Sequence, residues 1–410
     1  MPWDFDSGVR SCYKCQVMAD SSAAAPATSS SQPSPLLVSL HQRFGKPQVY
    51  SLLLLFAFAS QCFWLAARSP LTNLEMAYVS PGHAAEAAVG PESHSPVVAA
   101  LAKAALALAF PTGIDSPLWR MWLRAPFVLI GGLLGASLWY VSRRLYGNAG
   151  GYIALALYAF SPTMIQHWAA VSPDVIAAWG AFGCIFTGIA VAHTLYAPRE
   201  VFLWNYRRII LLAVGIGLGV AAVPATAFAV PIALCFMLYL VPHRRGATVG
   251  ILSAACVLAF VVMFATFGFS WHALTTFVRE SGTLQLSTAP MSGGVFSALA
   301  EGFFFRNGPA FTTLLLVTFC VWVGWRRARF FGTAAPLIVA VAFLVVGLLA
   351  VHRDVLVFLQ MALPFLFVFT AGVCADLLEL KSAYSGMVKA LILATVFSNC
   401  LFSISGLIRM

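Results

Sequence analysis

Charged residues are scarce in this chain. Only 9% of its 410 residues are Asp, Glu, Lys or Arg, whereas 60% are hydrophobic. Ordinary soluble domains carry charge on about a quarter of their residues, so this composition excludes them. The charges fall in short clusters between long apolar runs, which is typical of a protein that crosses a membrane several times. The net charge of +10 therefore indicates lipid topology and no nucleic-acid partner.

Recognisable metal-binding motifs are also lacking. Seven of the nine cysteines stand singly within apolar segments, where Cys packs as a small hydrophobe. Cys12 and Cys15 form a C-x-x-C pair, which is compatible with a redox motif or with half a zinc site. No second cysteine pair or nearby histidine completes that site, so we expect no metal there.

Two regions differ sharply in composition. Residues 1–46 include the small, polar, Pro-rich stretch "SSAAAPATSSSQPSP" and are expected to form a disordered cytoplasmic tail. Residues 47–410 are expected to form one polytopic transmembrane domain. The tail does not read as a signal peptide, because no apolar stretch follows a basic start at the usual distance.

The apolar runs predict an all-α integral membrane protein with about eleven transmembrane helices, since each span needs about 20 mostly apolar residues. The segment 209–242 is compatible with two short spans or one broken helix, because Pro224 and Pro231 interrupt it. The predicted spans are 49–67, 121–142, 149–168, 174–196, 209–223, 224–242, 248–269, 310–325, 333–351, 355–376 and 388–407.

Basic residues alternate along the predicted connections. Under the positive-inside rule, 16 of the 24 Lys and Arg residues fall on the cytoplasmic side, with the N-terminus inside and the C-terminus outside. The Arg-rich inner loops favour a multi-pass protein of a bacterial inner membrane. Eight of the 14 acidic residues fall on the outer side, where the long loop 68–120 is expected to carry an amphipathic surface helix at 94–110.

Two outer carboxylates stand out by position. Glu75 follows the first span closely, and Asp174 opens the fourth after a Ser-Pro turn. Either acid is compatible with a bland role: Glu75 as a solvated loop charge, and Asp174 as a favourable charge at a helix N-terminus.

The order of short motifs carries a resemblance. They are Glu75, "HSPV" (94–97), "RAPF" (124–127), "SRRLYG" (142–147), "AFSP" (159–162), "SPD" (172–174) and, more loosely, "HRDVLVFLQMALPFLFVFTAGVCADLL" from His352. This set resembles the GT-C superfamily of polytopic glycosyltransferases, and within it the family of the aminoarabinose transferase of lipid A and the protein O-mannosyltransferases. The chain departs from that pattern where Leu74, and no second acid, precedes Glu75.

The resemblance implies a membrane glycosyltransferase that moves a sugar from a polyprenyl-phosphate donor to an extracytoplasmic lipid, glycan or protein. It implies a catalytic carboxylate, either Glu75 or Asp174, and cations that hold the phosphate. Some GT-C enzymes hold a divalent cation, but this family is generally described without one, so we expect no cofactor. The expected donor-binding residues are His94, Arg120, Arg124, Arg306, His352 and Arg353.

Other interpretations stay open at this point. Arg124 is equally compatible with an interfacial anchor, His94 with the start of a surface helix, and Arg353 with an ion pair to Asp354. The main alternative function is a transporter or flippase. The span centres contain almost no ionisable residues and the two halves do not match, and both observations disfavour transport. A non-catalytic scaffold would have the same spans but would not need Glu75, Arg124 and Asp174 to converge.

Overall fold

The computed structural model of the chain is all-helical over its described residues. These are residues 47–79, 95–108, 116–195, 206–280, 297, 300–303, 307–324, 330–349, 355–379 and 384–409. The expected tail at 1–46 lies outside them. The helices are α3 (Pro47–Arg68), α4 (Asn73–Val79), α5 (Pro96–Leu108), α6 (Pro117–Ala159), α7 (Pro162–Trp168), α8 (Pro173–Thr194), α10 (Tyr206–Ala222), η2 (Pro224–Phe228), α11 (Ala229–Leu240), η3 (Pro242–Arg244), α12 (Arg245–Thr266), α13 (Trp271–Glu280), α15 (Pro309–Gly324), α16 (Phe330–Leu349), α17 (Val355–Glu379) and α18 (Tyr384–Arg409).

Among the described residues, seven helices are long and apolar enough to cross a membrane. They are α3, α6, α8, the helix from Pro242 to Thr266, and most of α16, α17 and α18. A multi-pass membrane protein is therefore supported. The expected eleven spans are not confirmed as a number, because several of the predicted segments form shorter or interrupted helices.

The predicted span 149–168 is one of the interrupted segments. Its first part continues α6, which bends at Gly147 (φ 76°), a backbone conformation that glycine adopts without a Cβ penalty. The helix then ends at Ala159, and the Ser161 hydroxyl accepts a hydrogen bond from the backbone N–H of Met164 to begin α7. Pro162 has no N–H to donate, so a new helix begins here.

The predicted segment 209–242 is also broken. Helix α10 ends at Ala222, a short 3₁₀ helix begins at Pro224, and α11 continues from Ala229. This arrangement agrees with the expectation that Pro224 interrupts the apolar run. The expectation was wrong for Pro231, which lies in the first turn of α11 and does not break it. Helix α13, by contrast, was not anticipated from the sequence.

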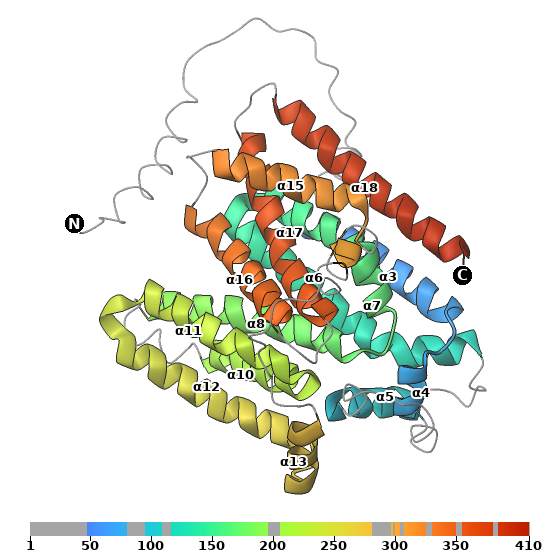
Figure 1. Cartoon of the computed structure of the whole chain (residues 1–410), viewed down its shortest axis with the longest axis vertical. Helices are drawn as coiled ribbons and strands as arrows, with labels where there is room; N and C mark the ends of the chain where they lie inside the picture. Colours follow the sequence, from blue (N-terminus) through green and yellow to red (C-terminus); the bar gives the residue numbers. More distant parts are fainter. Residues whose placement is uncertain are drawn as a thin grey trace, which may run out of the picture. The chain divides into compact units, whose positions relative to one another are not determined.

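Helix α17 is the core of the helical domain. It packs against α6, α8, α15, α16 and α18, and these helices surround its label in Figure 1. Most of its side chains are apolar and buried, as expected for a helix that is surrounded by others. On another side of the domain, α10 packs against both α8 and α12.

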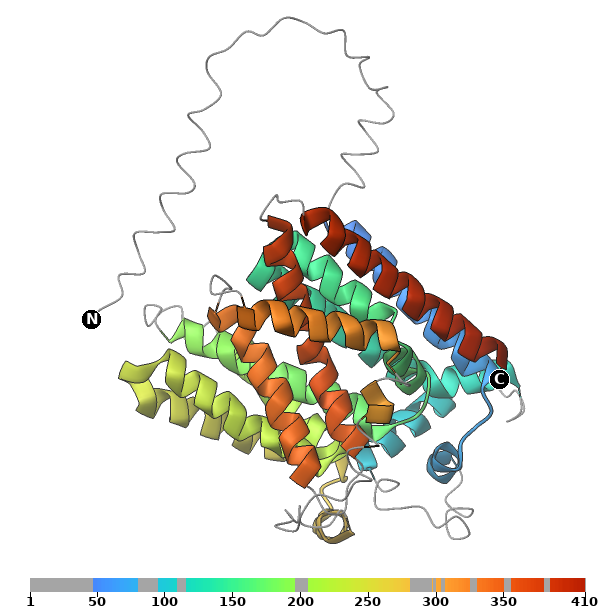
Figure 2. The same ribbon diagram turned by 45° about the horizontal axis from the view of Figure 1, so that its top comes forward.

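The segments expected on the outer side of the membrane gather together. Helices α4 and α5 contact each other, and α4, α5 and α13 lie toward the same end of the helices in both views (Figures 1 and 2). The stretch 94–110, where a helix is expected, forms α5 over Pro96–Leu108. The described parts of the first outer loop are therefore largely helical. Helix α5 packs against α6, and Glu75 of α4 contacts Arg124 near the start of α6.

Candidate functional site

Glu75 begins the site as part of a helix cap. The Glu75 backbone N–H donates to the Thr72 hydroxyl (3.3 Å), and the Thr72 backbone N–H donates back to Glu75 Oε2 (2.8 Å). This reciprocal pair is the capping box that a T-x-x-E sequence predicts. The stretch "TNLE" therefore starts α4 and fixes the Glu75 side chain with its carboxylate turned away from solvent (0% exposed).

Arg124 approaches that carboxylate from α6. Its Nε–H donates to Glu75 Oε1 and its Nη2 donates to Oε2, both at 2.7 Å. The result is a bidentate ion pair, the strongest geometry for Arg and a carboxylate. Arg124 is 1% exposed, so it is not an interfacial anchor that extends to the lipid headgroups.

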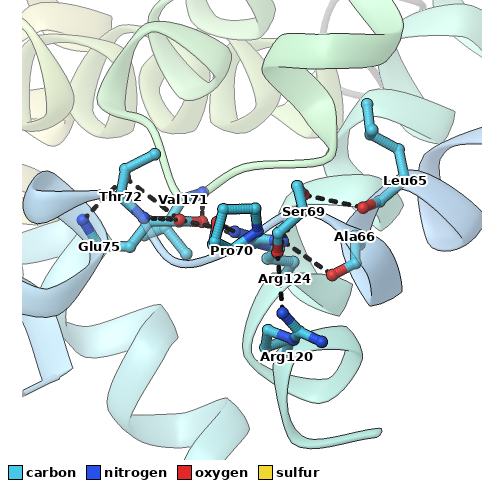
Figure 3. A network of polar contacts seen from close by, with 9 residues as sticks. All are labelled: Leu65, Ala66, Ser69, Pro70, Thr72, Glu75, Arg120, Arg124 and Val171. Carbon is cyan, nitrogen blue, oxygen red and sulfur yellow. Dashed lines mark hydrogen bonds and ion pairs between the residues drawn. The ribbon is translucent and has the colours of Figure 1, made fainter. Parts of the chain in front are cut away.

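The remaining donors of Arg124 close the C-terminal end of α3. Nη1 donates to the carbonyl of Ala66 (2.7 Å) and to both the hydroxyl and carbonyl of Ser69, and Nη2 donates to the carbonyl of Pro70 (3.0 Å). The last carbonyls of a helix lack intrahelical partners and favour a cation. Figure 3 shows Arg124 between these acceptors and Glu75. All its N–H groups are thereby engaged, and none remains for a phosphate in this arrangement.

Glu75 also reaches the segment that carries Asp174. Its Oε1 accepts a hydrogen bond from the backbone N–H of Val171 (3.0 Å). Ser172 then caps α8 by accepting from the Asp174 N–H (3.3 Å), and Pro173 occupies the first helical turn. Glu75 is thus bonded to the backbone of Val171, three residues before Asp174. Asp174 is itself only 9% exposed.

The ionisation of Glu75 follows from these contacts. Burial alone would raise the pKa of its carboxyl, because desolvation disfavours the charged form. The hydrogen bonds and charge of Arg124, with the backbone bonds from Thr72 and Val171, outweigh burial and leave the pKa below its ordinary value. Glu75 is therefore a carboxylate with five accepted hydrogen bonds.

Arg120 lies one turn before Arg124 and is less constrained. Its Nη1 donates to the Ser69 carbonyl at 3.4 Å, and its buried Nε has no hydrogen-bond partner within the described part of the chain. The side chain is half-buried. Of the predicted donor-binding residues, His94, Arg306, His352 and Arg353 lie outside the described residues.

Sequence reasoning missed a polar contact on the other side of α7. The side-chain amide nitrogen of Gln360 lies 2.7–2.8 Å from the ring nitrogens of His167. A cavity of about 10 Å³ beside them is lined by Thr163, His167, Gly302, Leu356, Leu359 and Gln360. His167 and Gln360 are 193 residues apart, and no local sequence signal connects them.

A larger apolar groove lies between α11 and α16. Its volume is about 570 Å³, and its walls are Ile232, Cys235, Phe236, Tyr239, Ala334, Ala335, Ile338 and Ala342. The α11 residues recur at helical spacing and so share one face. The small alanine side chains on α16 leave the space that forms the groove.

A metal-binding cluster is not found among the described residues. Within those ranges, no three His, Cys, Asp or Glu residues lie close enough together to hold a metal ion.

Comparison with known proteins gives a likeness of fold. No protein-family model and no curated protein sequence matches the chain. The structure of ArnT from Cupriavidus metallidurans bound to undecaprenyl phosphate matches with a TM-score of 0.58 at 14% identity, over 88% of this chain and 76% of that one. The archaeal oligosaccharyltransferase of Archaeoglobus fulgidus in its apo form matches with a TM-score of 0.54 at 12% identity, over 86% of this chain.

A second structure of the archaeal enzyme AglB, in complex with an inhibitory peptide and a dolichol-phosphate, matches with a TM-score of 0.51 at 12% identity. The chain spans only about half the length of these archaeal structures (55–56%). Because two different glycosyltransferases match at low identity, the likeness is to the GT-C fold as a class. It confirms the expected resemblance at the level of the fold.

Proposed function

We propose that this protein is a membrane glycosyltransferase that moves a sugar from a polyprenyl-phosphate donor to an acceptor on the extracytoplasmic side. The observation that carries the proposal is the shared fold over 88% of the chain with a structure that holds undecaprenyl phosphate. The convergence of α4, the start of α6 and the start of α8 supports it, because these elements join acidic and basic side chains in one place.

In the proposed reaction, an acceptor hydroxyl oxygen attacks the anomeric carbon of the donor sugar. The bond from that carbon to the phosphate oxygen breaks, and polyprenyl phosphate leaves with the bonding electrons. The acceptor proton passes to a carboxylate, for which we propose Asp174, one of the two outer acids predicted from the sequence, in the first turn of α8. A protein cation near the departing phosphate stabilises its growing charge.

For that cation we propose Arg120. Its Nε lacks a partner within the described part of the chain, so it has donors to give to a phosphate, whereas those of Arg124 are taken up by protein acceptors. His94, Arg306, His352 and Arg353 stay candidates for further donor contacts. No metal ion is part of the proposal.

The groove between α11 and α16 fits the lipid tail of such a donor. Its walls are apolar side chains, and an isoprenoid chain would be held there by burial of apolar surface alone. Cys235 lines the groove, and Cys320 on α15 is an exposed cysteine outside the groove lining. We expect Cys235→Trp to raise the KM for a long-chain donor severalfold and to leave a short-chain donor unaffected, whereas Cys320→Trp changes neither.

The function is tested by donor turnover. Membranes with the wild-type protein are incubated with a panel of radiolabelled polyprenyl-phosphate sugars, and release of polyprenyl phosphate is measured. We expect turnover with at least one donor and a loss of about 10²-fold or more in Asp174→Asn, as removal of a general base predicts. Glu379→Gln, which changes an exposed carboxylate at the end of α17, is the matched control. Turnover unaffected by Asp174→Asn would overturn the assignment of the base.

The alternative of a transporter has no comparable support. The buried charged side chains of the described residues are Glu75, Arg124, Asp174 and Asp376. Each lies within about two turns of a helix end. A transport path through the bilayer centre would instead place ionisable groups at mid-depth.

A further inference from the structure

The connection between α7 and α8 is held at both of its ends. Before it, His167 contacts Gln360 of α17. Near its end, the N–H of Val171 donates to Glu75 of α4. Ala169 and Val171 are themselves buried. The four residues that lead to Pro173 are therefore clamped between two helices distant in sequence, and Asp174 follows directly.

Glu75 is unsuited to accept a proton in this arrangement. Both of its oxygens already accept hydrogen bonds, and its charge is matched by a guanidinium that makes two 2.7 Å contacts with it. To act as a base it would have to give up a bond from Arg124, Thr72 or Val171, and leave that donor buried without a partner. A saturated network of this kind acts as a rigid unit.

From these contacts we infer that Glu75 and Arg124 form a positioning pair, which stays ionised throughout the reaction and holds the 169–172 connection so that Asp174 is correctly placed. This inference rests on the proposed function and deepens it, because it takes the first-loop acid out of the proton transfer. Supporting groups of this kind keep reacting side chains within about 0.5 Å of their productive geometry.

Activity measurements on paired substitutions separate a positioning pair from a base. Glu75→Gln leaves the buried guanidinium of Arg124 uncompensated, which is strongly unfavourable. Glu75→Gln with Arg124→Gln removes that charge and keeps an amide oxygen that can accept from Val171. We expect the single variant to lose about 10- to 100-fold in kcat per folded molecule with little change in KM, and the double variant to recover to within about tenfold of wild type.

Two other roles for Glu75, a catalytic base and a purely structural group, predict different kcat values for these variants. If Glu75 is the base, every variant without its carboxylate loses about 10²- to 10⁴-fold in kcat, and adding Arg124→Gln restores nothing. A purely structural role would lower the amount of folded protein in the single variant but leave kcat per folded molecule unchanged. Glu379→Gln, an exposed exchange of the same residue type, is expected to leave kcat at the wild-type value.

Hydrogen exchange tests the clamp without any enzyme assay. In the wild type, amide exchange across residues 169–172 is expected to be slow, because the Val171 N–H is bonded to a buried carboxylate. In Glu75→Ala we expect exchange of this stretch to become about tenfold faster or more, while the core helix α17 stays protected. Unchanged exchange at 169–172 would overturn the positioning role. Because this measurement needs no donor, a wild type without turnover would refute the proposed function and still leave the clamp testable.

Discussion

Tyr146, from the "SRRLYG" stretch, fills a slot made by glycines, and that slot gives a quantitative prediction for Gly372→Ala. The Tyr146 side chain is 1% exposed, and its hydroxyl donates to the carbonyl of Gly332. A Cβ added at Gly372 would lie 2.5 Å from Tyr146 Cζ and 2.7 Å from Cε1. The ring has little room to retreat, because its hydroxyl is held at Gly332 and its Cβ lies against the backbone of Gly150, where an added Cβ would be only 2.5 Å away.

Overpacking of a filled core costs about 1–3 kcal/mol. Since the obstacle here is a ring fixed at both ends, we expect Gly372→Ala to lie near the upper limit, at about 3 kcal/mol. That corresponds to a fall in the thermal unfolding midpoint on the order of 5 °C. The assay is thermal unfolding of the purified protein in detergent, monitored by the fluorescence of a thiol-reactive dye or of tryptophan.

Two comparisons make this prediction refutable. Gly132→Ala is the matched control, because nothing lies within 4 Å of the Cβ it would add, and alanine favours the helix by about 0.5–1 kcal/mol. Gly372→Ala combined with Tyr146→Leu removes the ring and should recover part of the loss, as coupled neighbours do. If Gly372→Ala were as stable as the wild type, or if the double variant recovered nothing, the tight slot around Tyr146 would be the wrong explanation.

Three further results are expected. Arg120→Gln should raise the KM for a polyprenyl-phosphate donor about tenfold in the turnover assay, while Arg207→Gln on α10 should not; an equal effect of both would contradict the proposed phosphate contact. The pKa of Glu75 is lowered in the fold, so its ionised carboxylate should stabilise the protein fully above its ordinary pKa near 4.5, and this stabilisation should be lost as the pH falls further. In Glu75→Gln, the free energy of unfolding measured below that pH should therefore depend less on pH than in the wild type. Gly180→Ala would place a Cβ 2.6 Å from the carbonyl oxygen of Gly215, so it should separate α8 from α10 and lower the unfolding midpoint by several degrees, and an unchanged midpoint would refute that close packing.

Much of the fold could be predicted from the sequence, because a membrane imposes a simple rule of length and polarity. The predicted spans 49–67, 174–196 and 355–376 coincide closely with α3, α8 and α17. The boundaries fail where proline and a capping residue divide an apolar run. The segment 149–168 is mostly apolar, yet one helix ends before Ser161 and another begins at Pro162. Hydropathy is averaged over windows of about 19 residues, whereas a cap depends on a single residue, so the average does not detect the break.

The candidate site was harder to predict, because its contacts join distant residues. Glu75 and Arg124 were both singled out, but their pairing spans 49 residues, and nothing in either motif indicates it. A local signal for part of the site did exist: "TNLE" has the spacing of a capping box. That spacing would have indicated that Glu75 is bound to its own helix start and is not a solvated loop charge.

The motifs that carry the family resemblance turn out to hold the fold together. Arg124 of "RAPF" closes the end of α3, Ser161 of "AFSP" and Ser172 of "SPD" cap α7 and α8, and Tyr146 of "SRRLYG" fills the glycine slot. A chain could therefore keep this ordered set for the sake of packing alone. Of the described residues, Asp174 and Arg120 are the ones on which the proposed chemistry depends. Substitutions at these two positions, and not the presence of the motifs, are therefore the decisive test of catalysis.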